Sequence, residues 1–319
     1  MRLLGAAALA GSATASLISY GAAHYLVNEL VKLRPLEAAD VFTFTPFETN
    51  VESEDVSFPT ANERLLKGWW LPRQNERRVV ITVSGYRGKK EDMLGLASHL
   101  WRNNFNVLMF DYRGHGAQRA EDELITLGHR ELQDMEAAIS YACSRIEHPL
   151  LGLLGGSMGA SVALVAAARN LDVKAVWADS PFTSQRDIID YVWRQRTHLP
   201  SHPVTDIAAR LFETRTGHRW EHFSPIDVIG QITPRPVYLV HSAEDKMIPV
   251  EHTYRLFEVA SEPKSIWIEE AQGHCGVYFM NRAEYVRRVV HFFGENLVDL
   301  SGTRSVQKST SHDLGLKLA

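Results

Sequence analysis

A short segment at residues 150–169 constrains the fold of this chain more than any other. Residues 150–154 form an apolar run of strand length, and residues 160–169 form an alanine- and valine-rich helical stretch. Between them lies Gly-Gly-Ser-Met-Gly at 155–159, whose G-x-S-x-G spacing is typical of a sharp strand-to-helix turn with a serine at its apex. The strand and helix pass so close to such a turn that side chains two positions before and after the serine would collide. The segment therefore predicts a strained turn that presents Ser157 as a nucleophile.

Strands and helices alternate on both sides of this turn. Residues 51–58 and 65–71 alternate apolar and polar positions, which predicts an antiparallel pair of half-buried strands. Further strands are expected at 79–83, 106–110, 173–177, 236–240 and 265–269, and further helices at 93–101, 130–146, 252–259 and 283–297. This order predicts an α/β fold with a mostly parallel central sheet flanked by helices.

A serine hydroxyl is a poor nucleophile at neutral pH. It needs a base to take its proton and an acid to orient that base. In a parallel sheet such groups meet beyond the carboxyl ends of the strands. His274 lies in the loop between the last expected strand and the last expected helix, from which it can reach the turn, so it is the candidate base.

Two carboxylates compete for the orienting role. Asp245 lies in the loop after the strand at 236–240, where it can reach the far nitrogen of the base. Its neighbour Glu244 is one residue out of place and is expected to point away. The rival is Asp179, at the end of the preceding strand, whose alternative role is to cap a turn. Asp245 is preferred.

Two backbone N–H groups are expected to form an oxyanion hole. One belongs to Met158, the residue after the nucleophile, and the other to Tyr86, in the loop that follows the strand at 79–83. Gly85 lets the backbone of that loop approach the substrate. By itself, however, Ser84-Gly85-Tyr86 is also typical of an ordinary turn.

The chain order Ser157, Asp245, His274 resembles that of the α/β-hydrolase superfamily. The resemblance extends over residues 51–297. Within the superfamily the chain is similar to the esterase and lipase-like branches, including bacterial members with an N-terminal hydrophobic segment. It rests on the stretches at 84–88, 111–116 and 155–159, on Asp245 with Pro249, and on Gly273-His274. One departure is Ser84, where the family usually has histidine before the glycine. The departure leaves the backbone N–H in place but removes a side chain that often braces the loop.

This resemblance implies a serine hydrolase that needs no cofactor and cleaves a carboxylic ester through an acyl-enzyme on Ser157. Thioesters, amides and short peptides would use the same groups. Serine at the turn argues against dehalogenase and epoxide hydrolase chemistry, for which the resembling families carry aspartate. An acyltransferase with the same triad and a non-catalytic ligand-binding protein on the same fold are the alternatives. The loop at 111–116 is expected to be structural.

Residues 183–231, called the lid here, interrupt the alternation of strands and helices. They are expected to form helices over the strand ends, inserted after the sixth strand. They contain five phenylalanine, tryptophan or tyrosine residues and three prolines: Tyr191, Trp193, Phe212, Trp220 and Phe223, with Pro200, Pro203 and Pro225. The aromatic residues suggest a substrate with an apolar acyl or alcohol group, although such residues more often pack within the lid itself.

The N-terminal segment at 1–34 is hydrophobic. Residues 3–28 carry no formal charge apart from that of His24, and they predict a membrane anchor. The alternatives are a signal peptide cleaved near residues 13–15, with the rest secreted, and a soluble or interfacial helix of a cytoplasmic protein. The expected organisation is completed by a linker at 35–50, the hydrolase domain at 51–298 and a disordered tail at 299–319.

Charge and cysteine content exclude several classes of function. The formal net charge of −4 gives no reason to expect nucleic-acid binding. The two cysteines, Cys143 and Cys275, cannot form a disulfide framework or a zinc site by themselves. The partner that the resemblance implies is a small acyl substrate, with neither metal nor cofactor.

Overall fold

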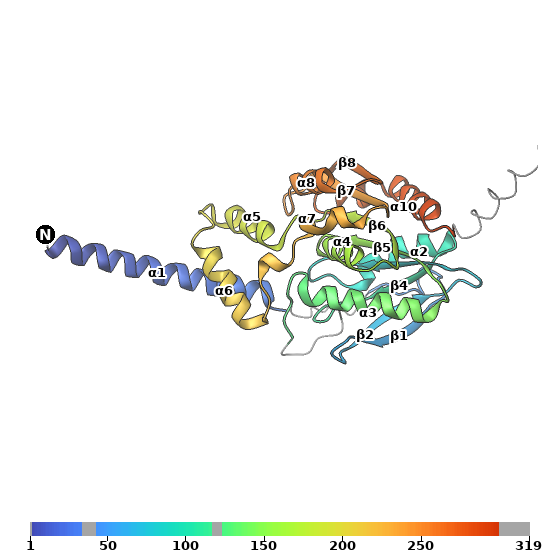
Figure 1. The fold of residues 1–319 in the computed structure, drawn as a ribbon, viewed down its shortest axis with the longest axis horizontal. Coiled ribbons are helices and arrows are strands. Elements are labelled where there is room, and N and C mark those ends of the chain that lie inside the picture. The colour runs from blue at the N-terminus through green and yellow to red at the C-terminus, as the bar shows by residue number, and fades with distance from the viewer. Residues whose placement is uncertain (1, 34–42, 117–122, 300–319) are drawn as a thin grey trace, which may run out of the picture.

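A single mixed sheet forms the centre of the protein. A computed structural model describes residues 2–33, 43–116 and 123–299, with the backbone alone for residues 2–13; within these ranges eight strands join in the order β1-β2-β4-β3-β5-β6-β7-β8 (Figure 1). Their bounds are β1 (Glu54–Pro59), β2 (Leu65–Leu71), β3 (Arg78–Val83), β4 (Asn106–Phe110), β5 (Leu150–Gly156), β6 (Val173–Asp179), β7 (Val237–Glu244) and β8 (Lys264–Gln272). β2 pairs antiparallel with β1 and β4, and the other neighbouring pairs are parallel. The predicted α/β fold is confirmed.

Helices cover both faces of the sheet. α3 (His129–Arg145), α4 (Met158–Arg169) and α8 (Glu251–Val259) lie on one face, and α2 (Leu94–Arg102) and α10 (Arg282–Asn296) lie on the other. Successive side chains of β3 enter different cores, because Val79 and Ile81 pack with the first group of helices and Val80 packs with the second. A strand buried on both faces has no polar alternation, which explains the unbroken apolar run in β3.

The last two strands extend beyond their predicted ends. β7 and β8 pair as far as Glu244 and Gln272, with a register shift after Ser242. Polar residues at these ends look like loop residues in the sequence, although their backbones belong to the sheet. The extension places Asp245 directly after β7, and His274 two residues after β8.

The lid is helical and follows the sixth strand, as expected. It contains α5 (Gln185–Thr197), α6 (Val204–Thr216), η3 (Trp220–His222), α7 (Pro225–Val228) and the start of η4 (Ile229–Ile232). Phe212 and Trp220 pack with ring centroids 5.8 Å apart, and their side chains are almost completely buried, as is that of Phe223. These three aromatic residues therefore stabilise the lid itself, and they give no indication of an apolar substrate.

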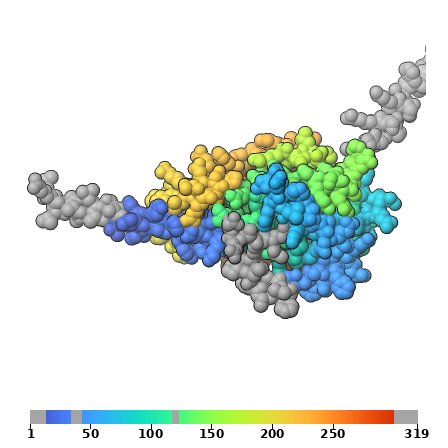
Figure 2. All heavy atoms as spheres, turned by 90° about the horizontal axis from the view of Figure 1, so that it is seen from below, coloured from blue at the N-terminus to red at the C-terminus, as the bar shows by residue number. Residues whose placement is uncertain are grey.

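The N-terminal segment forms one long helix, α1 (Arg2–Val31), which lies beside α6 (Figures 1 and 2). In its C-terminal half, Ala23, Val27 and Val31 are buried in the same core as α3 and α4. Arg215 of α6 also contacts His24, with 2.7 Å between the guanidinium and Nε2. This half of α1 is therefore part of the folded domain.

The structure does not bear out the membrane-spanning helix expected at residues 3–28. Within the described ranges, none of the helices is both long and apolar enough to cross a membrane. The segment lacks formal charge, but its many alanine and glycine residues are only weakly hydrophobic, and its serine and threonine residues are polar. Residues 35–42 of the expected linker and residues 300–319 of the expected tail lie outside the described residues.

Candidate active site

Ser157 stands between β5 and α4 in a strained conformation. Its φ of 58° and ψ of −124° are unfavourable for a residue with a Cβ atom. A Cβ atom on Gly155 would overlap the backbone carbonyl of Gly159, and a Cβ atom on Gly159 would overlap that of Ser84. The prediction that the strand-to-helix turn excludes side chains at both positions is confirmed.

His274 follows β8 with its two ring nitrogens in different environments. Its Nδ1 lies 2.6 Å from Oδ2 of Asp245, whereas its Nε2 is buried and has no hydrogen-bond partner among the described residues. The next residue, Cys275, lies against the turn, because a Cβ atom built on Gly156 would be 3.7 Å from its Sγ. The thiol also interacts with the backbone of Ser157. The loop thus places Cys275, the neighbour of His274, against the turn that carries Ser157, and it leaves Nε2 of His274 without a partner among the described residues.

Asp245 uses both of its carboxylate oxygens. Oδ1 accepts hydrogen bonds from the backbone N–H groups of Met247 at 2.8 Å and Ile248 at 3.0 Å. Oδ2 lies 2.6 Å from Nδ1 of His274 and 3.4 Å from Nε2 of His241. Burial opposes ionisation of this carboxyl, but the hydrogen bonds from the two histidines outweigh it and hold the pKa of Asp245 well below its ordinary value. The carboxylate is therefore ionised at neutral pH.

His241 supports Asp245 from within β7, a role that the sequence did not suggest. Its side chain is fully buried, with Nδ1 2.6 Å from Oγ1 of Thr253 and Nε2 2.8 Å from the carbonyl oxygen of Ile248. The only signal in the sequence is its position four residues before Asp245.

The rival carboxylate, Asp179, has other partners. It accepts hydrogen bonds from the hydroxyl groups of Ser180 at 2.9 Å and Tyr285 at 2.8 Å. Tyr285 in turn accepts a hydrogen bond from the indole N–H of Trp177 at 2.9 Å. Burial raises the pKa of Asp179. This carboxyl therefore belongs to a buried network between β6 and α10, whereas Glu244 is exposed.

The loop after β3 lies against Ser157. A Cβ atom on Gly85 would lie 2.8 Å from the Cβ atom and 3.2 Å from the Oγ atom of Ser157. Only glycine allows so close an approach, and the next residue in this loop is Tyr86. On the other side, Met158 is the first residue of α4, so its N–H has no acceptor within the helix. The two predicted oxyanion donors thus belong to segments that flank Ser157.

Comparisons with known proteins identify the family of this chain. Residues 74–216 match the family described as "Serine aminopeptidase, S33". The uncharacterized protein YqkD of Bacillus subtilis is 31% identical over 258 residues, which are 79% of this chain and 83% of that protein. The chain belongs to the α/β-hydrolase superfamily.

Two more distant relatives of this α/β-hydrolase carry functional names. The polyketide transferase ATR5 of Stachybotrys chlorohalonatus is 22% identical over 293 residues, which are 75% of this chain and 98% of that protein. The solved structure of the Pyrococcus furiosus esterase Pf2001 superposes with a TM-score of 0.69 at 22% identity, over 84% of this chain and 99% of that one. At this identity the structural likeness shows the shared fold.

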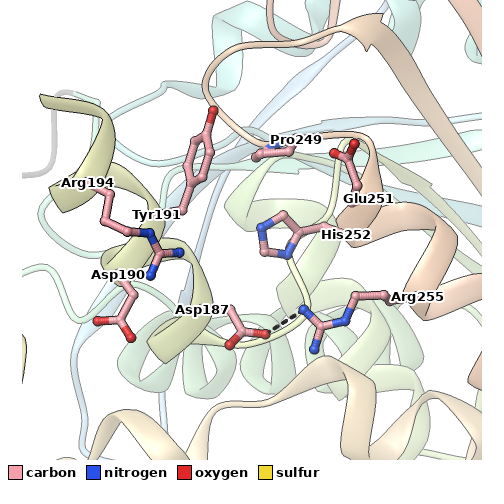
Figure 3. A pocket seen from close by; sticks show the side chains of 8 residues that line it. All are labelled: Asp187, Asp190, Tyr191, Arg194, Pro249, Glu251, His252 and Arg255. Carbon is pink, nitrogen blue, oxygen red and sulfur yellow. Dashed lines mark hydrogen bonds and ion pairs between the residues drawn. The ribbon is translucent and has the colours of Figure 1, made fainter. Parts of the chain in front are cut away.

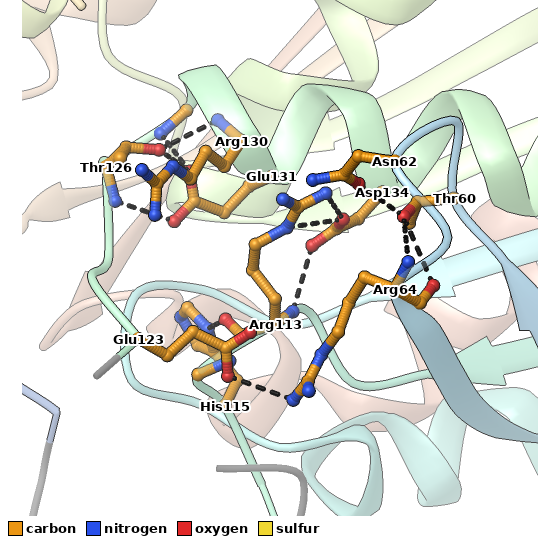
Figure 4. Close-up of polar contacts among 12 residues, drawn as sticks. Thr60, Asn62, Arg64, Arg113, His115, Glu123, Thr126, Arg130, Glu131 and Asp134 are labelled. Atoms are coloured by element: carbon orange, nitrogen blue, oxygen red, sulfur yellow. Dashed lines mark hydrogen bonds and ion pairs between the residues drawn. The ribbon is translucent and has the colours of Figure 1, made fainter. Parts of the chain in front are cut away.

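The loop at 111–116 of this α/β-hydrolase is held by buried charges (Figure 4). Arg113 donates to Asp134 through its Nε at 2.8 Å and through its backbone N–H at 2.9 Å. Burial raises the pKa of Asp134 to about 6, against the opposing effect of Arg113. Glu123 accepts from the N–H of Gly114 at 2.9 Å and from Arg64 at 3.1 Å. These contacts support the structural role expected for the loop.

A cavity of about 400 Å³ lies between α5 and α8, and Ser157, Asp245 and His274 are not among the residues that line it (Figure 3). Its wall carries both signs of charge, with Asp187 and Arg255 in an ion pair of 3.0 Å. Across the described ranges, no three histidine, cysteine, aspartate or glutamate side chains converge in a group that could hold a metal ion.

Proposed function

We propose that this α/β-hydrolase is a serine hydrolase that cleaves a carboxylic ester, with Ser157 as nucleophile, His274 as base and Asp245 as the orienting acid. The single observation that carries the proposal is the environment of His274. Its Nδ1 is bonded to an ionised carboxylate, while its Nε2 is buried without a hydrogen-bond partner among the described residues, and the next residue, Cys275, lies against the turn that carries Ser157. A histidine held in this way has one nitrogen available for proton transfer.

The proposed reaction has two steps. Oγ of Ser157 attacks the ester carbonyl carbon while Nε2 of His274 takes the hydroxyl proton, and the resulting oxyanion accepts hydrogen bonds from the N–H groups of Tyr86 and Met158. The C–O bond to the alcohol then breaks, and His274 donates the proton to the departing alkoxide. In the second step His274 activates a water molecule, whose attack on the acyl-enzyme releases the carboxylic acid.

A fluorophosphonate probe tests the nucleophile and the base. We expect the probe to label the full-length protein, and we expect no labelling of Ser157→Ala. Ester turnover by His274→Gln should fall by at least about 10³-fold, because removal of a triad member leaves only binding and oxyanion stabilisation. The matched control is Ser140→Ala, at an exposed position of α3, which should behave as the unmodified protein. Labelling of folded Ser157→Ala, or full turnover by His274→Gln, would contradict the proposal.

Acyl transfer is the second candidate function, and the matching polyketide transferase favours it. An acyltransferase would pass the acyl group from Ser157 to an alcohol or a thiol in preference to water. Product analysis with an added alcohol or thiol distinguishes the two functions, since a hydrolase forms mainly the free acid. The family name "Serine aminopeptidase" makes amino-acid amides the other substrates to compare with esters.

A further inference from the structure

The C-terminal end of α1 is capped by the loop that lies against Ser157. The last carbonyl groups of a helix have no partners within the helix. The hydroxyl of Tyr86 is placed to donate to the carbonyl oxygen atoms of Leu30 at 2.8 Å and Glu29 at 3.1 Å. The guanidinium of Arg87 reaches the carbonyl oxygen atoms of Glu29 at 2.6 Å and Lys32 at 2.8 Å. Two consecutive residues of the catalytic domain therefore satisfy the end of α1.

These same residues lie on the other side against the nucleophile. Gly85 touches Ser157, Tyr86 follows it, and the N–H of Gly88 closes a turn on the carbonyl of Gly85 at 3.0 Å. Arg87 adopts a φ of 59°, and its guanidinium lies 4.9 Å from the centroid of the Tyr86 ring. A residue held at this φ keeps its conformation only when its surroundings impose it.

The contact of Tyr86 with α1 is partly buried, and the tyrosine side chain packs against the hydrophobic core. Burial raises the pKa of Tyr86 to about 12, and its hydroxyl therefore remains a donor at any ordinary pH. Val27 and Val31 pack in the core just below, and the carbonyl of Val31 accepts from the N–H of Ile125 at 3.1 Å. The end of α1 is thus a fixed point against which the loop can be held.

We propose that the Tyr86 hydroxyl and the Arg87 guanidinium are positioning groups that use the end of α1 to fix the Tyr86 N–H in the oxyanion hole. The N-terminal helix is then a working part of the active site. This inference rests on the proposed function, because it requires that the Tyr86 N–H stabilises an oxyanion. Tyr86→Phe is the direct test, since it keeps the ring and the backbone N–H and removes only the hydroxyl.

We expect Tyr86→Phe to lower kcat for a p-nitrophenyl ester about 5- to 10-fold, the scale of one hydrogen bond, with KM changed less than about twofold. Affinity for benzeneboronic acid, which adds to the serine oxygen as a tetrahedral boronate, should fall by the same factor as kcat. Arg87→Met, which keeps an unbranched apolar stem and removes both hydrogen bonds that Nη2 makes to Glu29 and Lys32, should show the same pattern. The matched control is Tyr25→Phe, at an exposed position of α1, which should leave both constants unchanged.

Parallel losses of kcat and boronate affinity support the proposal, because a merely structural defect would lower the amount of active enzyme without changing the inhibition constant. The proposal is overturned if Tyr86→Phe keeps its kcat, or if it loses kcat with its boronate affinity intact. Failure of the proposed function would look different, since the unmodified protein would then neither react with a fluorophosphonate nor hydrolyse the ester. Circular dichroism, together with a melting transition above the assay temperature, establishes that each variant is folded.

Discussion

At the scale of single residues, the two oxygens of Asp245 have separate tasks. Oδ1 is bound by backbone N–H groups, which fix the carboxylate, and Oδ2 faces the rings of His274 and His241. The carboxylate can therefore orient His274 without any movement of its own. An amide of the same shape would present an N–H group to one of these partners and would favour the wrong tautomer of the base.

We accordingly expect Asp245→Asn to lower kcat by about 10³- to 10⁴-fold while the protein stays folded. Glu244→Gln, at the exposed neighbouring position, is the control and should retain full activity. Steady-state ester hydrolysis measures both. The rival assignment makes the opposite forecast: if Asp179→Asn abolished turnover and Asp245→Asn did not, Asp179 would be the orienting acid.

The residues of this site differ in how much of their role the sequence reveals. Ser157 is readable because its turn requires glycines at fixed spacing, and this steric rule acts within a few residues. His274 and Asp245 can be nominated because each follows a predicted strand. The partners of Asp179 on α10 and the support from His241 could not be predicted, because they depend on contacts between elements distant in sequence.

At the scale of elements, α3 and the lid are joined by a histidine that is neutral in the folded state. His129 at the start of α3 lies with its Nε2 2.9 Å from Oε1 of Gln185 in α5, and its ring stacks on His218 with centroids 4.8 Å apart. Burial, together with the nearby His218, lowers the pKa of His129 from 6.5 to about 4. Protonation of His129 therefore favours the unfolded chain, in which the pKa is near its ordinary value.

The stability contributed by neutral His129 is complete above pH 6.5 and is lost as the pH falls toward 4. Between these pH values the unfolded protein binds up to one more proton at His129 than the folded protein does. His129→Asn removes this difference, so the slope of the unfolding free energy against pH should decrease by up to about 1.4 kcal/mol per pH unit. Urea unfolding at a series of pH values between 4 and 7 measures this slope. His148→Asn, at a histidine whose side chain is 83% exposed, should keep the original slope. An unchanged slope in His129→Asn would show that the ring is not neutral in the fold.

Elements were predictable where one strand or helix carries its own pattern. The bounds of β2 and β4 are those expected, since their apolar residues end where the strands end. The polar ends of β7 and β8 were missed because pairing between the strands, and not local hydrophobicity, keeps them in the sheet. α9 (Gly276–Met280) was also not predicted; it is short, and it follows directly after Cys275, which has a φ of 52°.

At the scale of the whole molecule, the hydrolase domain includes the C-terminal half of α1. Hydrophobicity alone could not predict this, because an uncharged stretch of alanine and leucine fits a membrane, a signal peptide or a protein core. The distinguishing evidence is tertiary: Val27 and Ala23 are completely buried, and the end of the helix is bonded to Tyr86. The segment and the domain should accordingly unfold together.

Val27→Ala provides the test of this joint unfolding. Removing two buried methyl groups should lower the free energy of unfolding by about 2 kcal/mol, from lost burial and the cavity left behind. Leu17→Ala, at a position of the same helix that is 73% exposed, should change it by less than about 0.5 kcal/mol. Urea unfolding followed by tryptophan fluorescence reports the domain, because the described part of α1 contains no tryptophan. If Val27→Ala left that transition where it was, α1 would be an independent appendage, and its bonds to Tyr86 and Arg87 would have no bearing on the stability of the active site.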